Sequence, residues 1–149
     1  MSFLSAFNTS VSGMTDQRQR VNTISENIAN AETTRTPQGG PYRRREVILA
    51  SVANDRTFEE ELLSQDRSVS TSTEVKVVGI VQDERPPILR FEPGHPDANE
   101  EGYVEMPNVN IMEEMVNLMS ANRSYEANTA AFNATKNMVQ SALDLGRNA

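Results

Sequence analysis

The fold is decided by the stretch NIMEEMVNLMSANRSYEANTAAFNATKNMVQSALDL, which spans residues 110–145. Apolar residues recur in it every seven positions without a break, which is the spacing of one face of a helix. The members of this lane are Ile111, Leu118, Tyr125, Phe132 and Val139. Asn110 precedes the lane as a candidate N-cap, and Glu113 completes a variant of the capping box. The stretch predicts a helix of about 50 Å, and Gly146 is expected to end it.

The N-terminal segment, from Ser2 to about Thr33, shows the same spacing. Its lane is Phe7, Met14, Val21 and Ile28, accompanied by Leu4, Val11 and Ile24 at steps of three and four. Two helices of similar length at opposite ends of a chain favour antiparallel pairing into a rod. We therefore expect a mainly α fold in which residues 1–34 and 110–149 form long helices that pair as an antiparallel coiled coil.

The segment between the two predicted helices, residues 35–109, is typical of a small β-rich element. It begins with Thr36-Pro37-Gln38-Gly39-Gly40-Pro41, a strong helix breaker. Runs of apolar and β-branched residues predict short strands over residues 42–50, 75–81, 88–91 and 102–106. Residues 51–74 are rich in Ser, Thr, Asp and Glu, and we expect them to form a flexible loop.

The predicted helices carry more apolar surface than one helix pair can cover. A lone hairpin of two helices leaves part of each apolar lane in contact with water, and such surface marks an interaction site. We therefore expect neighbouring subunits to cover it. The candidate assembly residues are Leu4, Phe7, Val11, Met14, Val21, Ile24, Asn27, Ile28 and Asn30 in the first helix, and Ile111, Met115, Leu118, Asn122, Tyr125, Asn128, Phe132, Val139 and Leu143 in the second.

Asparagine is frequent in both predicted helices although it is a poor helix former. Asn27, Asn30, Asn122 and Asn128 are examples. Any one of them could simply face water. As a set they favour hydrogen bonds between neighbouring helices, which would fix helix register as a polar heptad position does.

Composition excludes several function classes. The chain has 149 residues, a net charge of −7, one His and no Cys. Disulfides, thiolate metal sites and multi-His sites are therefore excluded, and we expect neither a metal nor a cofactor. Negative charge disfavours nucleic acid as a partner. No apolar run reaches the ~18 residues of a membrane span, so we expect no membrane insertion, and the N-terminus is not typical of a cleavable signal peptide.

An enzymatic role would have to use His95, in the turn Pro93-Gly94-His95-Pro96-Asp97. A general base needs a positioned partner and a substrate pocket. A His in a proline-rich turn is more typical of a rigid turn residue, so we do not expect an enzyme.

Arg43, Arg44 and Arg45 form a basic run in this acidic chain. They could line a solvated strand edge. Alternatively, their guanidinium groups could pair with carboxylates of an adjacent subunit. We treat them as candidate residues for ion pairs between subunits.

Several motifs resemble those of the bacterial flagellar rod, hook and hook-associated proteins. Ser12-Gly13-Met14, Gln17 and Val21-Asn22-Thr23-Ile24-Ser25-Glu26-Asn27-Ile28-Ala29-Asn30-Ala31 resemble the N-terminal motif of that wider family. Residues 33–44, 93–98 and 106–110 are more specific and are similar to the rod proteins of the proximal rod. Residues 113–116 and 121–128 resemble the family's C-terminal helix. Gln38 departs from the acidic residue expected there, and residues 51–74 match weakly.

The resemblance implies a structural subunit that leaves the cell through the flagellar type III export apparatus. It implies polymerisation through the terminal helices into the helical tube that crosses the periplasm, with the helices in its inner layer. The implied partners are further copies of the chain, other proximal rod subunits, the export-gate junction protein and the distal rod protein; contact with the surrounding basal-body ring stays open. The alternative is a cytoplasmic coiled-coil adaptor, which has no reason to carry rod motifs at both ends.

Overall fold

The computed structural model describes residues 3–53 and 73–147. The elements in chain order are α1 (Phe3–Ala29), β1 (Arg45–Ala53), β2 (Thr73–Gln82), β3 (Ile88–Phe91), β4 (Tyr103–Met106) and α3 (Ile111–Arg147). The prediction of a mainly helical fold with a small β content is confirmed for this part of the chain.

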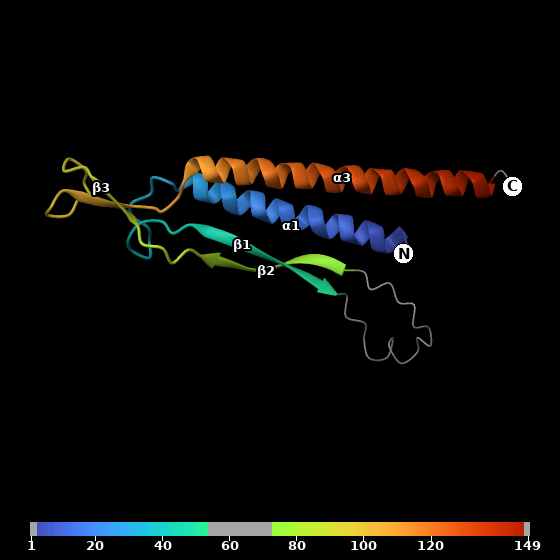
Figure 1. Ribbon diagram of the computed structural model, residues 1–149, viewed down its shortest axis with the longest axis horizontal. Coiled ribbons are helices and arrows are strands. Elements are labelled where there is room, and N and C mark those ends of the chain that lie inside the picture. Colours follow the sequence, from blue (N-terminus) through green and yellow to red (C-terminus); the bar gives the residue numbers. More distant parts are fainter. Residues whose placement is uncertain (1–2, 54–72, 148–149) are drawn as a thin grey trace, which may run out of the picture.

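The helices α1 and α3 lie side by side and run in opposite directions, so the start of α1 and the end of α3 are at the same end of the molecule (Figure 1). Phe7 packs edge to face on Phe132 with ring centroids 4.9 Å apart, and Asn27 bonds Glu114 near the other end of the pair. α3 has 37 residues and α1 has 27, so α3 extends beyond the start of α1 (Figure 1). Coiled-coil packing of the pair stays a prediction.

The helix α1 ends at Ala29, so the predicted helix over residues 1–34 is wrong at its C-terminal end. Asn30 Nδ2 donates to the carbonyl oxygen of Glu26 at 2.9 Å. The backbone N–H of Thr33 then donates to the carbonyl oxygen of Asn30 at 3.1 Å. These bonds close the last turn and redirect the chain before the proline-rich breaker is reached.

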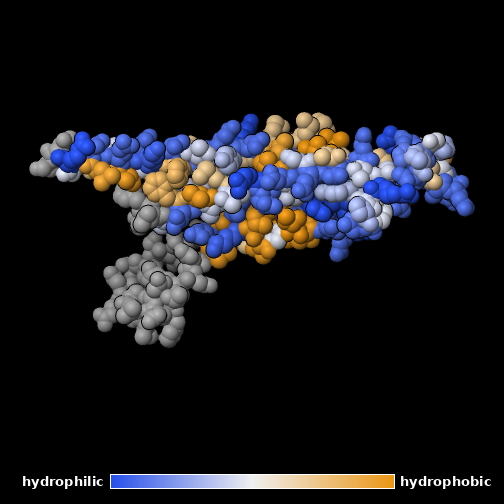
Figure 2. Space-filling model, turned by 180° about the vertical axis from the view of Figure 1, so that it is seen from behind, coloured by the Kyte–Doolittle hydropathy of each residue, from blue (hydrophilic) through white to orange (hydrophobic). Residues whose placement is uncertain are grey.

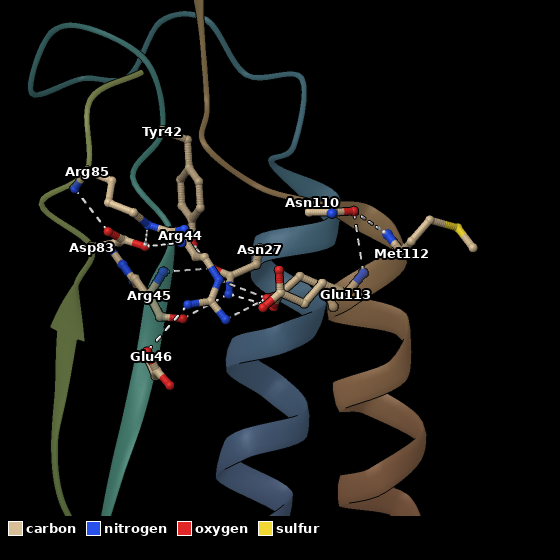
Figure 3. A network of polar contacts seen from close by, with 11 residues as sticks. Asn27, Tyr42, Arg44, Arg45, Glu46, Asp83, Arg85, Asn110, Met112 and Glu113 are labelled. Atoms are coloured by element: carbon tan, nitrogen blue, oxygen red, sulfur yellow. Dashed lines mark hydrogen bonds and ion pairs between the residues drawn. The ribbon is translucent and has the colours of Figure 1, made fainter. Parts of the chain in front are cut away.

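The start of α3 is capped as predicted. Asn110 Oδ1 accepts the backbone N–H of Met112 at 3.1 Å and that of Glu113 at 3.5 Å (Figure 3). The predicted end is wrong, because α3 continues to Arg147 and passes through Gly146. Gly146 lacks the positive φ of a glycine that ends a helix.

The strands form two separate antiparallel pairs, β1–β2 and β3–β4, rather than one β element. The β1–β2 pair lies along α1 on the side away from α3, so α1 is the middle layer (Figure 1). The β3–β4 pair projects beyond the other end of the helices (Figure 1). Pro86 and Pro87, which stand between β2 and β3, cannot donate to a strand ladder and so separate the two pairs.

The strands β1 and β2 reach further than predicted. Residues 51–53 and 73–74, assigned above to a flexible loop over 51–74, belong to the paired strands. The pairing register shifts between Ile48 and Leu49, which marks a bulge. Residues 54–72 of the predicted loop lie outside the described residues.

The buried core of the described chain is small. Its buried apolar residues are Ile24, Val104 and Ala121. Its buried polar residues are Ser10, Asp16, Thr23, Asn27, Glu114 and Thr135. Many larger apolar side chains stay at the surface, where they form patches along the body of the molecule (Figure 2). A single chain therefore leaves much of its apolar surface uncovered.

Candidate functional site

Asn27 in the last turns of α1 joins segments that are distant in sequence (Figure 3). Its side chain is fully buried. Its Oδ1 accepts the Tyr42 hydroxyl and the Arg45 backbone N–H, each at 2.9 Å. Its Nδ2 donates to the Arg45 carbonyl at 2.8 Å and to Glu114 Oε2 at 2.9 Å. An amide side chain has two donors and two acceptor positions, so Asn27 uses its whole hydrogen-bonding capacity here.

Glu114 on α3 forms a buried ion pair with Arg44, which stands just before β1. The Glu114 side chain is 1% exposed and the Arg44 side chain 12%. Arg44 Nε and Nη2 each lie 2.8 Å from Glu114 Oε1. Burial lowers the pKa of Arg44, but the hydrogen bond and the charge of Glu114 outweigh it and raise that pKa overall. Arg44 therefore stays charged, and its charge is compensated by Glu114.

Tyr42 completes the cluster, and we call Asn27, Tyr42, Arg44 and Glu114 the polar junction. Burial is the main cause that raises the pKa of Tyr42, which keeps its hydroxyl protonated so that it can donate to Asn27. The guanidinium of Arg45 lies 6.0 Å from the centre of the Tyr42 ring. The polar junction joins α1, α3 and the start of β1 into one unit.

The first half of α3 presents an apolar face to solvent. Met112 is 71% exposed and Val116 59%, and Met115 and Met119 are exposed as well. These four residues share one helix face by their spacing of three and four, and we call them the outer stripe. Because Glu114 and Ala121 are buried on the opposite side of α3, the outer stripe faces away from α1.

A groove continues the outer stripe toward β3. It measures about 500 Å³ and is lined by Ile88, Ile111 and Met112, with Arg85 among its polar residues. Its lining is mixed, because charged and amide side chains lie beside the apolar ones, and only its apolar part continues the outer stripe.

The structure brings together part of the predicted assembly set. Ile24 and Asn27 are buried, and a further group is half-buried: Phe7, Met14, Val21, Ile28, Asn30, Leu118, Asn128, Phe132 and Val139. Another group is exposed: Val11, Ile111, Met115, Asn122, Tyr125 and Leu143. The side chain of Leu4 lies outside the described residues. The half-buried group flanks the contact between α1 and α3, and the exposed group is free to meet a neighbour.

Gly13 on α1 lies directly against the side chain of Asn128 on α3. A Cβ on Gly13 would lie 2.8 Å from Asn128 Nδ2, so a side chain at residue 13 requires the Asn128 amide to move. Ala121 and Thr135, seven residues to either side of the half-buried Asn128, are buried. Small and polar residues therefore line this part of the contact. In the sequence, the pattern that marks Ala121, Asn128 and Thr135 is the seven-residue spacing that they share with the apolar lanes.

The three arginines differ in their surroundings. Arg44 is committed to Glu114, and Arg45 Nη1 lies 3.4 Å from Glu26 Oε2 within the same chain. Arg43 is exposed and forms no ion pair with any residue that the structure describes. Glu114, the partner that sequence reasoning missed, stands in the first turn of α3, where a Glu is also explained by the helix dipole.

His95 takes the local role of a turn residue. Its Nδ1 accepts the backbone N–H of Asp97 at 3.1 Å. Asp97 in turn accepts the Thr34 hydroxyl at 2.8 Å and pairs with Arg35 at 3.2 Å. These contacts fasten the turn between β3 and β4 to the segment that follows α1.

Neither helix of the described chain is long and apolar enough to cross a membrane. Over residues 3–53 and 73–147, no group of three or more His, Asp or Glu side chains is placed to hold a metal ion.

Comparison with known proteins identifies the family. The model of the family described as flagella basal body rod protein matches residues 7–35, and the model described as flagellar basal body rod FlgEFG protein C-terminal matches residues 100–145. These matches cover most of α1 and all of β4, with nearly all of α3.

Relatives align with the chain from end to end. The flagellar basal-body rod protein FlgC of Borreliella burgdorferi is 42% identical over 147 residues, which cover 96% of this chain and 97% of that protein. FlgC of Bacillus subtilis is 43% identical over 152 residues and covers 99% of this chain and 100% of its own length. FlgC of Escherichia coli O157:H7 is 37% identical, with 99% and 100% covered. The chain therefore belongs to the FlgC family of flagellar basal-body rod proteins.

Proposed function

We propose that this chain is a structural subunit of the proximal rod of the flagellar basal body and that it polymerises through its two helices. Membership of the rod family makes it a structural protein and not an enzyme. The cytoplasmic adaptor is not favoured, because the rod-family matches lie at both ends of the chain.

The outer stripe carries the proposal. Met112, Met115, Val116 and Met119 form a continuous apolar face on a helix that is otherwise polar on that side. Burial of apolar surface stabilises an interface by roughly 25 cal/mol per Å². Methionine side chains adapt to irregular partner surfaces, which suits a subunit that meets neighbours of different sequence.

The end of α3 supports the same conclusion. Beyond the start of α1, α3 has no partner helix among the residues that the structure describes (Figure 1). Met138, Leu143 and Leu145 are exposed in this part. A neighbouring subunit that covered these three side chains would bury apolar surface at the C-terminal end of α3.

The organisation of the subunit follows from these surfaces. The terminal segments, residues 1–34 and 110–149, form the core through α1 (Phe3–Ala29) and α3 (Ile111–Arg147), which wind as a coiled coil in the inner layer of the tube. Residues 35–109 form the middle element, which packs outside that layer. Of the three arginines, Arg43 is the one left for an ion pair between subunits, because Arg44 and Arg45 are paired within the chain.

Family membership supports assembly of the chain with itself and with other rod components. The specific partners that we propose are the other proximal rod subunits, the export-gate junction protein and the distal rod protein. The surrounding basal-body ring is a further proposed contact. Rod-family membership supports delivery of the chain to the basal body by flagellar export.

The substitution Val116→Asp tests the proposal. Because Val116 is exposed in the single chain, an Asp there leaves the fold intact but places an unpaired charge in the proposed interface. We expect normal cellular levels of the chain, no rod in isolated basal bodies and no swimming. Asn133→Asp, which adds the same charge at an exposed polar position of α3, is the matched control and should swim. Normal rods in the Val116→Asp strain would refute assembly through the outer stripe.

A further inference from the structure

We infer that the buried Arg44–Glu114 pair, held by Asn27, is a register lock: it selects one alignment of α1 and α3 out of several that their apolar lanes would accept. The inference concerns the fold of each subunit. Its meaning for a polymer rests on the proposed function, because only subunits with one shape can repeat in a helical tube.

The apolar lanes do not select a register by themselves. In the observed alignment Phe7 packs on Phe132. A slip of α3 by one heptad would bring Tyr125 or Val139 to that place, and both residues are apolar and belong to the same lane. Heptad patterns that repeat in this way are compatible with several alignments unless a polar residue distinguishes them.

The contact at Gly13 does not select a register either. Gly13 faces Asn128, which stands between Ala121 and Thr135 in steps of seven residues. All three α3 residues are small or polar and lie on the face turned to α1, where Ala121 and Thr135 are buried. Any of them could stand opposite Gly13 once the helices had slipped.

The polar junction accepts one alignment. Asn27 lies fourteen residues after Gly13, and Glu114 lies fourteen residues before Asn128, so the two contacts belong to the same register. A slip in one direction would place Asn27 against Ala121, and a slip in the other would move it past the N-terminus of α3. Because Asn27 also bonds the backbone of Arg45, the segment that carries Arg44 stays with α1. Every slip therefore separates Arg44 from Glu114.

Separating Arg44 from Glu114 would destabilise the fold, because each residue would lose the main partner of its charge. Glu114 is 1% exposed and has no contact with water, whereas Arg44 is 12% exposed and has the exposed Glu46 as a weaker second partner at 3.4 Å. A buried pair of this kind adds little stability relative to apolar residues of similar size, but an uncompensated buried charge is strongly destabilising. The pair thus penalises wrong alignments far more than it stabilises the right one.

Disulfide trapping in the purified full-length chain tests the lock. The chain contains no Cys, so two introduced cysteines report one contact. Gly13→Cys with Asn128→Cys reports the observed register. Gly13→Cys with Ala121→Cys or with Thr135→Cys reports the two slipped registers, each combined with Asn128→Ala because a Cβ at residue 13 would clash with the Asn128 amide. Intramolecular products are separated from dimers by mass after oxidation.

In the parent chain we expect the observed-register disulfide to dominate, with slipped products below about one hundredth of it, as the penalty for an unpaired buried charge implies. In the double variant Arg44→Met with Glu114→Leu, the apolar lanes still pair the helices, and the slipped products rise to amounts comparable with the observed one. The matched control is Arg45→Met with Glu26→Leu, which removes an exposed ion pair between the start of β1 and α1 and should leave the parent pattern unchanged.

Two outcomes overturn the inference. If the double variant forms only the observed-register disulfide, the lanes or the glycine contact select the register without the pair. If it forms none of the three disulfides, the pair holds the helices together rather than choosing their alignment. Glu114→Gln, which keeps the size of the side chain, provides a second variant if the double variant does not fold; it too must yield slipped products. None of these readouts depends on rod assembly, so they are independent of the Val116→Asp test.

Discussion

Gly13 on α1 and Asn128 on α3 meet so closely that a Cβ on residue 13 would lie 2.8 Å from Asn128 Nδ2. With the Asn128 amide in this position, the contact leaves no space for a side chain at residue 13. The helix that Gly13 approaches belongs to the same chain.

Substitutions at Gly13 should destabilise the chain according to their size. Gly13→Leu should lower the free energy of unfolding by about 1–3 kcal/mol, because overpacking forces the helices apart. Gly13→Ala should stay close to the parent, because Ala gains about 1 kcal/mol in helix propensity and the Asn128 amide can rotate away. Urea denaturation followed by circular dichroism measures both. A Gly13→Leu chain as stable as the parent would contradict the close contact.

Replacing Glu114 alone should lower the free energy of unfolding far more than replacing Glu114 and Arg44 together by apolar residues. Glu114→Ala leaves the largely shielded Arg44 with only the 3.4 Å ion pair to the exposed Glu46, and it should lower the free energy of unfolding by about 3 kcal/mol. Arg44→Met with Glu114→Leu should be close to neutral, since apolar residues then fill the same space. Glu26→Ala, at an exposed ion pair, should change stability by about 1 kcal/mol at most. Equal costs for Glu114→Ala and Glu26→Ala would show that the Arg44–Glu114 pair is not desolvated.

The carboxyl group of Asp16 should oppose folding at neutral pH. It is buried between α1 and β2, and its Oδ2 has no hydrogen-bond partner. Burial raises the pKa of Asp16 above 3.8, while a hydrogen bond from the Val77 backbone and the charge of Lys76 act in the opposite direction. Since the folded state disfavours the charged form, the penalty is absent below the ordinary pKa and grows as pH rises through the raised pKa.

Asp16→Asn should therefore stabilise the chain near pH 7, and its advantage should shrink as pH falls toward 4. Denaturation midpoints of the parent and the variant, measured across this range, give the difference directly. An advantage that does not change with pH, or a variant less stable than the parent near pH 7, would be inconsistent with a buried carboxylate.

Asp83 should titrate well below other aspartates. Its Oδ2 accepts Arg85 Nε at 2.8 Å, and its Oδ1 accepts the Arg85 backbone N–H at 3.0 Å. The side-chain hydrogen bond from Arg85 is the main cause that lowers the pKa of Asp83 from 3.8 to about 2. The pair contributes stability above pH 3.8 and loses it as pH falls through the lowered pKa. An NMR titration of the Asp83 carboxyl should show this value in the parent and a return toward 3.8 in Arg85→Gln; identical titrations would disprove the contact.

The helices and strands could be predicted from the sequence because each has a local signal. The seven-residue lane through Leu118 and Phe132 has the period of a helix, and Asn110 has the chemistry of an N-cap. The strand over 88–91 was predicted with the bounds that β3 has. Boundaries failed where a long-range or side-chain contact decides them, as at Asn30, whose side chain bonds the carbonyl oxygen of Glu26.

The arrangement of these elements was less accessible from the sequence. Arg44 and Glu114 are 70 residues apart, and each has an ordinary local explanation, one in a basic run and the other at a helix start. Only the fold brings their charges together. The separation of the middle segment into two strand pairs follows likewise from packing, because β1 and β2 lie against α1, which a count of short strands does not reveal.

The central claim is that another subunit covers the outer stripe in the rod, and thiol labelling of Met119→Cys tests it most directly. The substitution introduces the only Cys of the chain at an exposed position of α3. In the purified chain the thiol should react rapidly with a maleimide. In isolated basal bodies it should be protected, and denaturation of the same basal bodies should restore full reactivity. Equal labelling of the purified chain and of intact basal bodies would contradict the claim.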